Sequence, residues 1–414
     1  MSHSPDMVQH ADPHLICVIP CRNEPDPVMT LESLCRCDPP DVPVEVIMVI
    51  NGSDNDTAQV REANQHSLHK VTSWIDNQAH CFFTVRTRYH PDLPHRQAGV
   101  GLARRLGMDE ACNRLLRAHE TTPGIIVALD ADCQVAPNYW TALVDHFRQN
   151  PKIVGASLYF QHPLDNLTAN HRQGIIHYEL FLRIYRQGLR YAGSPHAFHT
   201  VGSAMAVRAD TYRRVGGMNQ RKAGEDFYFL QKVMAHGMFS DLTTTTVFPS
   251  ARMSLRVPFG TGRAMTQWHQ EQPQHFLTYD PRVYADLRHF FQAVAKTSRT
   301  WEGQIPNASP CLEAFLTRQG FDLAFAEIAA NTASAESFMK RFFLWFNPFK
   351  ILKFVHFASE TWYPRVPVRQ AAEILLQWLG RPLDQTIEGD EKLLHVFQRL
   401  DRNSGQDTRY GAVQ

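Results

Sequence analysis

The sequence has no excess of charge of either sign and no long hydrophobic run. Lysine and arginine number 42 against 41 acidic residues, which leaves a formal net charge of +1. Proteins that bind nucleic acid usually carry a basic surplus, so we expect no nucleic-acid partner. No segment offers the roughly 18 consecutive apolar residues of a membrane-spanning helix, and the first residues lack the pattern of a secretory signal. We therefore expect a cytoplasmic protein that does not span a membrane.

The cysteines also lack a pattern. None of the eight belongs to a paired Cys-x-x-Cys arrangement, which disfavours a zinc site. Several lie in apolar runs, as Cys17 does in LICVIP, and this favours buried, reduced thiols. Internal repeats and low-complexity tracts are absent. The 414 residues, 43% of them hydrophobic, suffice for one large domain with an appendage or for two domains.

Apolar runs alternate with segments of helical spacing along the first two-thirds of the chain. The predicted strands lie at 15–20, 44–50, 81–89, 124–130, 153–160 and 243–249. The predicted helices lie at 28–34, 56–68, 99–118, 137–147, 166–189 and 225–237, and 199–217 is expected to form a strand, a turn and a helix. Such alternation predicts an α/β fold with a mostly parallel sheet flanked by helices, whose ligands bind at the carboxyl ends of the strands.

Beyond about residue 275 the alternation stops and helical segments predominate. We therefore predict a domain boundary between 270 and 280. The expected organisation is a flexible tail at 1–13, an α/β domain at 14–272 and a mainly helical region at 273–414.

Two aspartates in ALDADCQVAP follow the predicted strand at 124–130. A turn at the end of a strand can direct the carboxylates of Asp130 and Asp132 into one cleft. Carboxylate oxygens are ligands that suit Mg²⁺ or Mn²⁺ bound to a diphosphate, and such an ion would neutralise charge on a leaving nucleoside diphosphate. The alternative is a solvated, turn-forming pair.

Polar loops also follow the first two predicted strands, as PCRNE and NGSDNDT. In a parallel sheet these loops meet the aspartate pair at one edge. Asn51, Ser53 and Asp54 offer donors and acceptors for a nucleobase edge and a ribose. The alternative is that NGS forms only a tight turn.

Four sequence segments carry a resemblance to a known family. VIPCRNE, VINGSDNDT, ALDADC and the stretch from VGSAMAVRADTYRRVGGMN to GEDFYFLQKV occur in this order. Together they resemble the motifs of family 2 glycosyltransferases of the GT-A fold, over about residues 14–270. The resemblance implies an inverting transfer from a nucleoside-diphosphate sugar to a hydroxyl of a carbohydrate or lipid-linked acceptor, with Mn²⁺ or Mg²⁺.

The same resemblance implies roles for individual residues. The donor pocket would be lined by Pro20, Arg22, Glu24, Asn51 and Ser53, and Arg104 would approach the donor. Asp130 would lie near the ribose or the metal, and Asp132 would be the main metal ligand. Asp226, assisted by Glu225, would be the base that deprotonates the acceptor hydroxyl. From the residues alone, this acidic pair could equally be favourable charge at the start of a helix.

Two departures from the family pattern limit the resemblance. Asn51 stands where the family usually has an acidic residue, which puts uridine specificity in doubt. GRAMTQW at 262–268 only partly resembles the QxxRW signature of processive synthases, and membrane helices are lacking, so a polymer synthase is disfavoured. Trp268 is predicted to stack on an acceptor sugar, with a core indole as the alternative.

Other interpretations remain. Arg252, Arg256 and Arg263 flank a glycine-rich turn that could form a lid over the diphosphate. His196 and His199 lack further ligands at metal-binding spacing, which disfavours a metal role for them.

A GT-A-like module that binds a nucleotide sugar or a partner without turnover is the alternative function, and a nucleotidyltransferase is a lesser one. A dehydrogenase is excluded because Arg104 stands where AGVGLARRLG would need a third small residue.

The segment 337–364 is dense in phenylalanine and tryptophan, with lysine and arginine interleaved. Such a composition suits peripheral contact with a membrane, and a lipid-linked acceptor would make this interpretation more attractive. The alternative is a core helix or a helix at the interface of a homo-oligomer.

Overall fold

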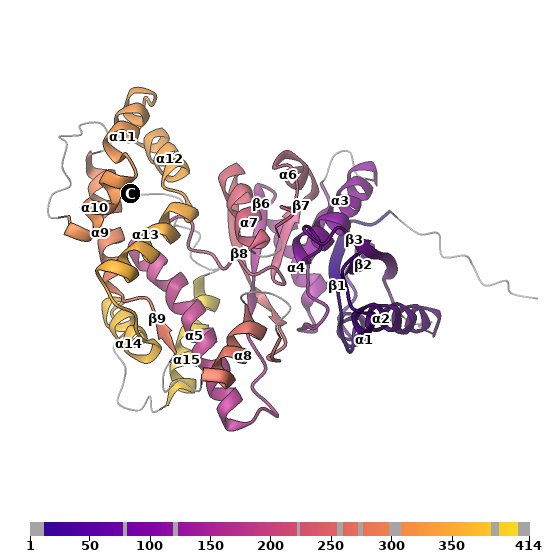
Figure 1. Cartoon of the computed structure of the whole chain (residues 1–414). Helices are drawn as coiled ribbons and strands as arrows, with labels where there is room; N and C mark the ends of the chain where they lie inside the picture. Colours follow the sequence, from indigo (N-terminus) through magenta and orange to yellow (C-terminus); the bar gives the residue numbers. More distant parts are fainter. Residues whose placement is uncertain are drawn as a thin grey trace, which may run out of the picture. The chain divides into compact units, whose positions relative to one another are not determined.

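The computed structural model describes residues 12–77, 81–118, 123–221, 224–254, 260–271, 276–297, 308–381 and 389–404. The chain forms two compact units that interleave in sequence (Figure 1). The first unit runs to Phe160 and includes Thr200–Ser250, whereas the second contains Gln161–His199 and the chain from Ala251 onward. The boundary predicted near residue 272 falls inside the second unit. The domain limits drawn from the family resemblance stay a prediction.

The first unit is built on an eight-stranded sheet, in the order β3-β2-β1-β4-β7-β6-β8-β5. Its strands are β1 (Leu15–Cys21), β2 (Val44–Ser53), β3 (Thr84–Leu93), β4 (Ile125–Ala128), β5 (Gln134–Val135), β6 (Ile153–Phe160), β7 (Met205–Arg208) and β8 (Met238–Phe248). The pairs β1–β2, β1–β4, β2–β3 and β6–β8 are parallel, whereas β4–β7, β6–β7 and β5–β8 are antiparallel. The predicted α/β fold with a mostly parallel sheet is confirmed.

The helices of this unit are α1 (Val28–Cys35), α2 (Ala58–Asn77), α3 (Val100–Ala118), α4 (Tyr139–Gln149), α6 (Ala209–Arg214) and α7 (Glu225–His236). The helix α3 packs closely on the sheet at Gly107. A Cβ atom at this position would lie 2.4 Å from Cγ1 of Val18 and 2.9 Å from Cγ2 of Val49. This close approach holds α3 against β1 and β2, and thereby positions the turn that carries Arg104.

The second unit is mainly helical, and it includes the predicted helical region at 273–414 together with segments assigned to the α/β domain from the sequence. It contains α5 (Ala169–Ala192), α8 (Thr261–Glu271), α9 (Arg282–Thr297), α10 (Pro310–Arg318), α11 (Phe321–Ala330), α12 (Ala335–Trp345), α13 (Pro348–Thr361), α14 (Val368–Trp378) and α15 (Asp390–Asn403). Two short strands, β9 (Leu277–Thr278) and β10 (Val366–Pro367), pair antiparallel; the sequence did not predict them. Among the described residues, no helix combines the length and the apolar character needed to cross a bilayer.

The aromatic segment 337–364 mostly fills the core of this unit. Phe338, Phe342, Phe346 and Phe354 are fully buried in one cluster, which favours the core interpretation over a membrane-facing one. Two large apolar residues of this segment are exposed to solvent: Leu344 by 46% and Trp362 by 40%. Membrane contact and homo-oligomerisation stay predictions.

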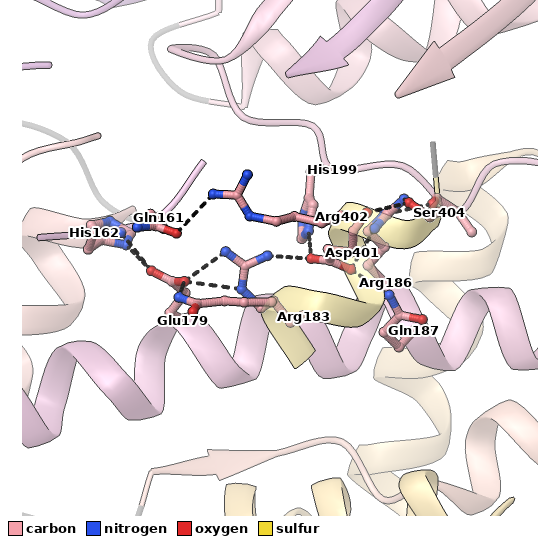
Figure 2. A network of polar contacts seen from close by, with 12 residues as sticks. Gln161, His162, Glu179, Arg183, Arg186, Gln187, His199, Asp401, Arg402 and Ser404 are labelled. Carbon is pink, nitrogen blue, oxygen red and sulfur yellow. Dashed lines mark hydrogen bonds and ion pairs between the residues drawn. The ribbon is translucent and has the colours of Figure 1, made fainter. Parts of the chain in front are cut away.

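A buried polar network joins α5 to α15 in this unit (Figure 2). Glu179, which is fully buried, accepts hydrogen bonds from the backbone N–H of His162 (2.8 Å), from Nη2 of Arg183 (2.7 Å) and from Gln398 (2.7 Å). Asp401, 1% exposed, faces Arg183, Arg186, Gln187 and His199. Each carboxylate is thus surrounded by donors, as buried charges require.

Candidate active site

Arg104 on α3 joins carboxylates from two other elements of the first unit. Its Nη2 lies 2.5 Å from Oδ1 of Asp130, just after β4, and its Nη1 pairs with Glu225 at the start of α7. Burial alone would lower the pKa of Arg104, but the surrounding carboxylates outweigh burial and raise it. Arg104 therefore stays charged and holds the end of β4 beside the start of α7.

Two glycines make room for this arrangement. A Cβ atom at Gly101, in the first turn of α3, would lie 2.1 Å from the carbonyl oxygen of Arg221. A Cβ atom at Gly202 would lie 2.3 Å from Nη1 of Arg104. The guanidinium thus rests against bare backbone at Gly202, in the VGS stretch just before β7. The sequence analysis placed this stretch in a family motif and assigned Gly202 no role.

The acidic pair at the start of α7 is held in an environment that favours its protonated form. Burial raises the pKa of Glu225 to about 6, with Arg104 opposing the shift and Asp226 adding to it. Burial also raises the pKa of Asp226, and nearby Asp130 adds to this effect while Arg104 opposes it. The single positive charge of Arg104 therefore lies near three carboxylates. Such a surplus of negative charge favours uptake of a proton or a cation, and is a feature of functional sites.

The predicted metal ligands are partly accessible at the carboxyl end of β4. The Asp130 side chain is 37% exposed, and Asp132 lies half-buried in the turn that follows. Among the described residues, no group of three or more His, Cys, Asp or Glu side chains is arranged to hold a metal. Mg²⁺ commonly binds one or two carboxylates and takes its other ligands from phosphates and water. The donor set thus fits an ion shared with a diphosphate rather than one caged by protein.

The loops after β1 and β2 lie side by side, because the register pairs Pro20 with Val49 and Cys21 with Ile50. Arg22 forms an ion pair with Asp56, whose Oδ2 accepts a hydrogen bond from the backbone N–H of Ser53 (2.8 Å). The two loops predicted to hold the nucleoside are thereby joined. Asp56 was missed as a site residue, although it belongs to the NGSDNDT segment.

Three predicted pocket residues are almost fully buried in these loops: Glu24 (5% exposed), Asn51 (2%) and Ser53 (2%). The amide nitrogen of Asn51 has no hydrogen-bond partner among the described residues, and an unpaired buried donor is costly. The backbone oxygen of Asn51 accepts a hydrogen bond from Asn64 on α2 (3.1 Å). Asn64 also accepts one from the backbone N–H of Asn23 (2.7 Å), and no sequence motif pointed to it.

Several residues singled out in the sequence lie elsewhere. Trp268 belongs to the second unit, is 3% exposed and donates its indole N–H to the backbone oxygen of Asn170 (3.0 Å). The structure thus places it in a core rather than on a surface where a sugar could stack. Arg252 and Arg263 also belong to this unit, and Arg256 lies outside the described residues, so the arginine lid stays a prediction.

The two histidines considered for a metal role are packed within the second unit. His199 Nε2 lies 2.8 Å from Oδ2 of Asp401, and His196 Nε2 lies 3.3 Å from the carbonyl oxygen of Phe343. Burial lowers the pKa of both, to about 4 for His196. Each side chain is thus accounted for by polar contacts inside the fold.

Comparison with known proteins bears on the segment that carries these aspartates. Residues 125–270 match the model of glycosyl transferase family group 2. Among curated proteins, no sequence is significantly similar to this chain. Among solved structures, TarS of S. aureus in complex with UDP-GlcNAc is similar at 10% identity and a TM-score of 0.41, covering 95% of this chain and 91% of that chain.

A second similar structure is the mannosyltransferase PcManGT from Pyrobaculum calidifontis in complex with GDP-Man and Mn²⁺. It shares 17% identity at a TM-score of 0.35, over 84% of this chain and 87% of that chain. At such low TM-scores, neither likeness establishes a donor, an acceptor or a metal for this chain.

Proposed function

We propose that the first unit of this chain performs an inverting sugar transfer, because residues 125–270 match the model of glycosyl transferase family group 2. The donor is a nucleoside-diphosphate sugar, and the acceptor is a hydroxyl of a carbohydrate or of a lipid-linked saccharide. The observation that carries the proposal is the gathering of Asp130, Glu225 and Asp226 around the single guanidinium of Arg104.

Asp226 is the proposed base. Its carboxylate takes the proton of the acceptor hydroxyl while the hydroxyl oxygen bonds to the anomeric carbon. The bond from that carbon to the phosphate oxygen breaks on the opposite face, and the nucleoside diphosphate leaves with the electron pair. The raised pKa of Asp226 suits this role, because a base is most effective when its pKa approaches the working pH. Glu225 pairs with Arg104 and helps to position the start of α7.

Asp130 and Asp132 would hold the divalent cation together with oxygens of the diphosphate. When bound, such an ion neutralises charge that develops on the leaving group. The positions of the two residues support this assignment, because both are partly accessible at the end of a strand. The ion pair with Arg104 also orients the Asp130 carboxylate.

The loops after β1 and β2 are the proposed nucleoside site. The unpartnered amide nitrogen of Asn51 offers a donor that a nucleobase or ribose oxygen can satisfy. The ion pair between Arg22 and Asp56 keeps the two loops together. Arg22 therefore supports the pocket through Asp56. We also expect Arg22 itself to contact the donor.

The alternative function is a module that binds a nucleotide sugar without turnover. The raised pKa of Asp226 favours the enzyme, because it costs stability and a binding module has no need of a poised base. The two functions differ in whether bound donor is consumed when an acceptor is supplied.

The test measures binding of UDP, GDP, CDP and dTDP sugars by calorimetry, with Mn²⁺ and with chelator, followed by mass spectrometry for transfer or slow donor hydrolysis. We expect metal-dependent binding of one nucleotide class, abolished in Asp132→Ala and retained in Asp145→Ala, an exposed aspartate on α4. Binding by none of the sugars would refute the proposed donor site. Binding without consumption, across a panel of acceptors, would favour the binding module.

A further inference from the structure

The second unit contains an open cavity of about 270 Å³, lined by His356, Ser359, Glu360 and Arg365. The first three residues lie on α13 at spacings of three and four, and therefore share one face of its last turns. Arg365 immediately precedes β10. The cavity is thus lined by the last turns of α13 and by the residue that precedes β10.

Tyr279 holds the two sides of this cavity together. The antiparallel register pairs Val366 with Thr278, which places Arg365 across from Tyr279. The guanidinium carbon of Arg365 lies 4.9 Å from the centroid of the Tyr279 ring. The hydroxyl of Tyr279, a residue only 6% exposed, lies 3.1 Å from Nε2 of His356. A buried ring therefore fixes two of the four lining side chains before any ligand arrives.

The lining carries opposite charges that are not paired. Within the part of the chain that the structure describes, neither Arg365 nor Glu360 forms an ion pair. Burial and the nearby Arg365 lower the pKa of His356, so its imidazole is neutral near pH 7. The hydroxyl of Ser359 donates to the backbone oxygen of Val355 (2.8 Å), which leaves its lone pairs free to accept. The cavity thus offers both strong donors and strong acceptors without net charge.

A ligand with hydroxyl groups suits such a lining, because each hydroxyl can donate to Glu360 or accept from Arg365. The volume lies just below the roughly 300–1,000 Å³ of sites for drug-sized ligands, which matches one sugar ring rather than a nucleotide. Because Glu360 and Arg365 carry opposite charges, the lining as a whole selects neither an anion nor a cation.

We propose that this cavity is a binding site for a neutral monosaccharide unit, free or as part of a longer saccharide. The proposal concerns residues of the second unit and requires neither a nucleotide nor turnover. Its outcome is therefore independent of whether the first unit transfers a sugar.

The test uses saturation-transfer difference NMR of the full chain with the methyl glycosides of glucose, galactose, mannose and N-acetylglucosamine at millimolar concentration. We expect transfer to at least one of them, and an affinity about tenfold weaker in Arg365→Gln and in Glu360→Gln, because each change removes a charge-assisted hydrogen bond. Glu360→Gln preserves the side-chain shape, so it still tests the proposal if Arg365→Gln disturbs the β9–β10 ribbon.

Two control variants make the test specific. Arg318→Gln changes an arginine that lies 4.9 Å over the ring of Phe357, outside the cavity, and should leave the transfer unchanged. Asp132→Ala should also leave it unchanged. The proposal is overturned if none of the four glycosides receives saturation, or if the signal persists in both cavity variants. It is also overturned if the signal disappears in Asp132→Ala, since the sugar would then occupy the proposed donor site.

Discussion

Each unit of this protein contains a buried cluster of arginine and carboxylate side chains, and the two clusters differ in charge balance. In the first unit, one arginine, Arg104, faces Asp130, Glu225 and Asp226. In the second, Arg183 and Arg186 face Glu179 and Asp401, and donors from His199, Gln187 and the backbone of His162 complete the shells (Figure 2).

The pKa values of the carboxylates follow from that balance. Burial would raise the pKa of Glu179 and of Asp401, but the neighbouring arginines and histidines prevail and hold both well below the ordinary range. Around Arg104 burial prevails, and the pKa values of Glu225 and Asp226 are raised. A balanced cluster stabilises one arrangement of helices, whereas a cluster with surplus negative charge is poised to take up a proton or a cation.

Replacing Asp226 by Asn should have the largest effect on activity, with little loss of stability. We expect kcat to fall by about 10²–10⁴-fold, because the acceptor hydroxyl loses its base. The urea midpoint should be unchanged or higher, since the substitution removes one of the crowded carboxylates. Steady-state kinetics and denaturation of the same preparation measure both quantities. Full activity of this variant would exclude Asp226 as the base.

The reverse pattern is expected for Asp401→Asn. This change removes the carboxylate that faces Arg183 and Arg186, and breaking a buried ion pair on one side costs about 3–5 kcal/mol of unfolding free energy. Urea denaturation followed by circular dichroism measures the loss. Asp41→Asn, which disrupts an exposed pair with Arg148, is the control and should shift the midpoint little. A similarly small shift for Asp401→Asn would show that the network contributes no such stability.

Gly202→Ala should perturb the first cluster without removing a charge. The added methyl group would meet the Arg104 guanidinium, and overpacking of this kind costs about 1–3 kcal/mol. Displacing Arg104 should also weaken metal-dependent donor binding, which calorimetry would detect. Gly320→Ala, at a φ of +64° with no atom within 4 Å of the added Cβ, serves as the comparison. It should lower stability through backbone strain alone and leave donor binding intact.

The smallest effect concerns pH. Because Asp226 must be ionised to act as a base and its pKa is raised, kcat should decline as pH falls, at a pH above the value of about 3.9 for an ordinary aspartate. Glu179 and Asp401 have depressed pKa values, so their contribution to stability is present above the ordinary carboxylate pKa and is lost only in stronger acid. Activity should therefore decline at a pH at which the second unit is still folded. Measuring pH–rate profiles and circular dichroism on the same preparation would test this.

Much of the first unit could be predicted because its signals are local. Runs such as VEVIMVI and GIIVALD are apolar throughout, as strands buried on both faces must be. Their predicted positions differ from those of β2 and β4 by a few residues at the ends. The last two of the four motifs lie within residues 125–270, which match the model of glycosyl transferase family group 2.

The sequence by itself thus determined the longer strands and helices of the first unit, the strand-end positions of Asp130 and Asp132, and the acidic start of α7, because each depends on neighbouring residues and on backbone periodicity. Tertiary structure alone decided that Arg104 joins Asp130 and Glu225, which lie 26 and 121 residues away, and that α5 belongs with the C-terminal helices through Asp401. It also buried Trp268 and set Tyr279 beneath Arg365. The physical reason is that charge balance and burial depend on which distant segments pack together, and residue spacing along one chain does not specify those partners.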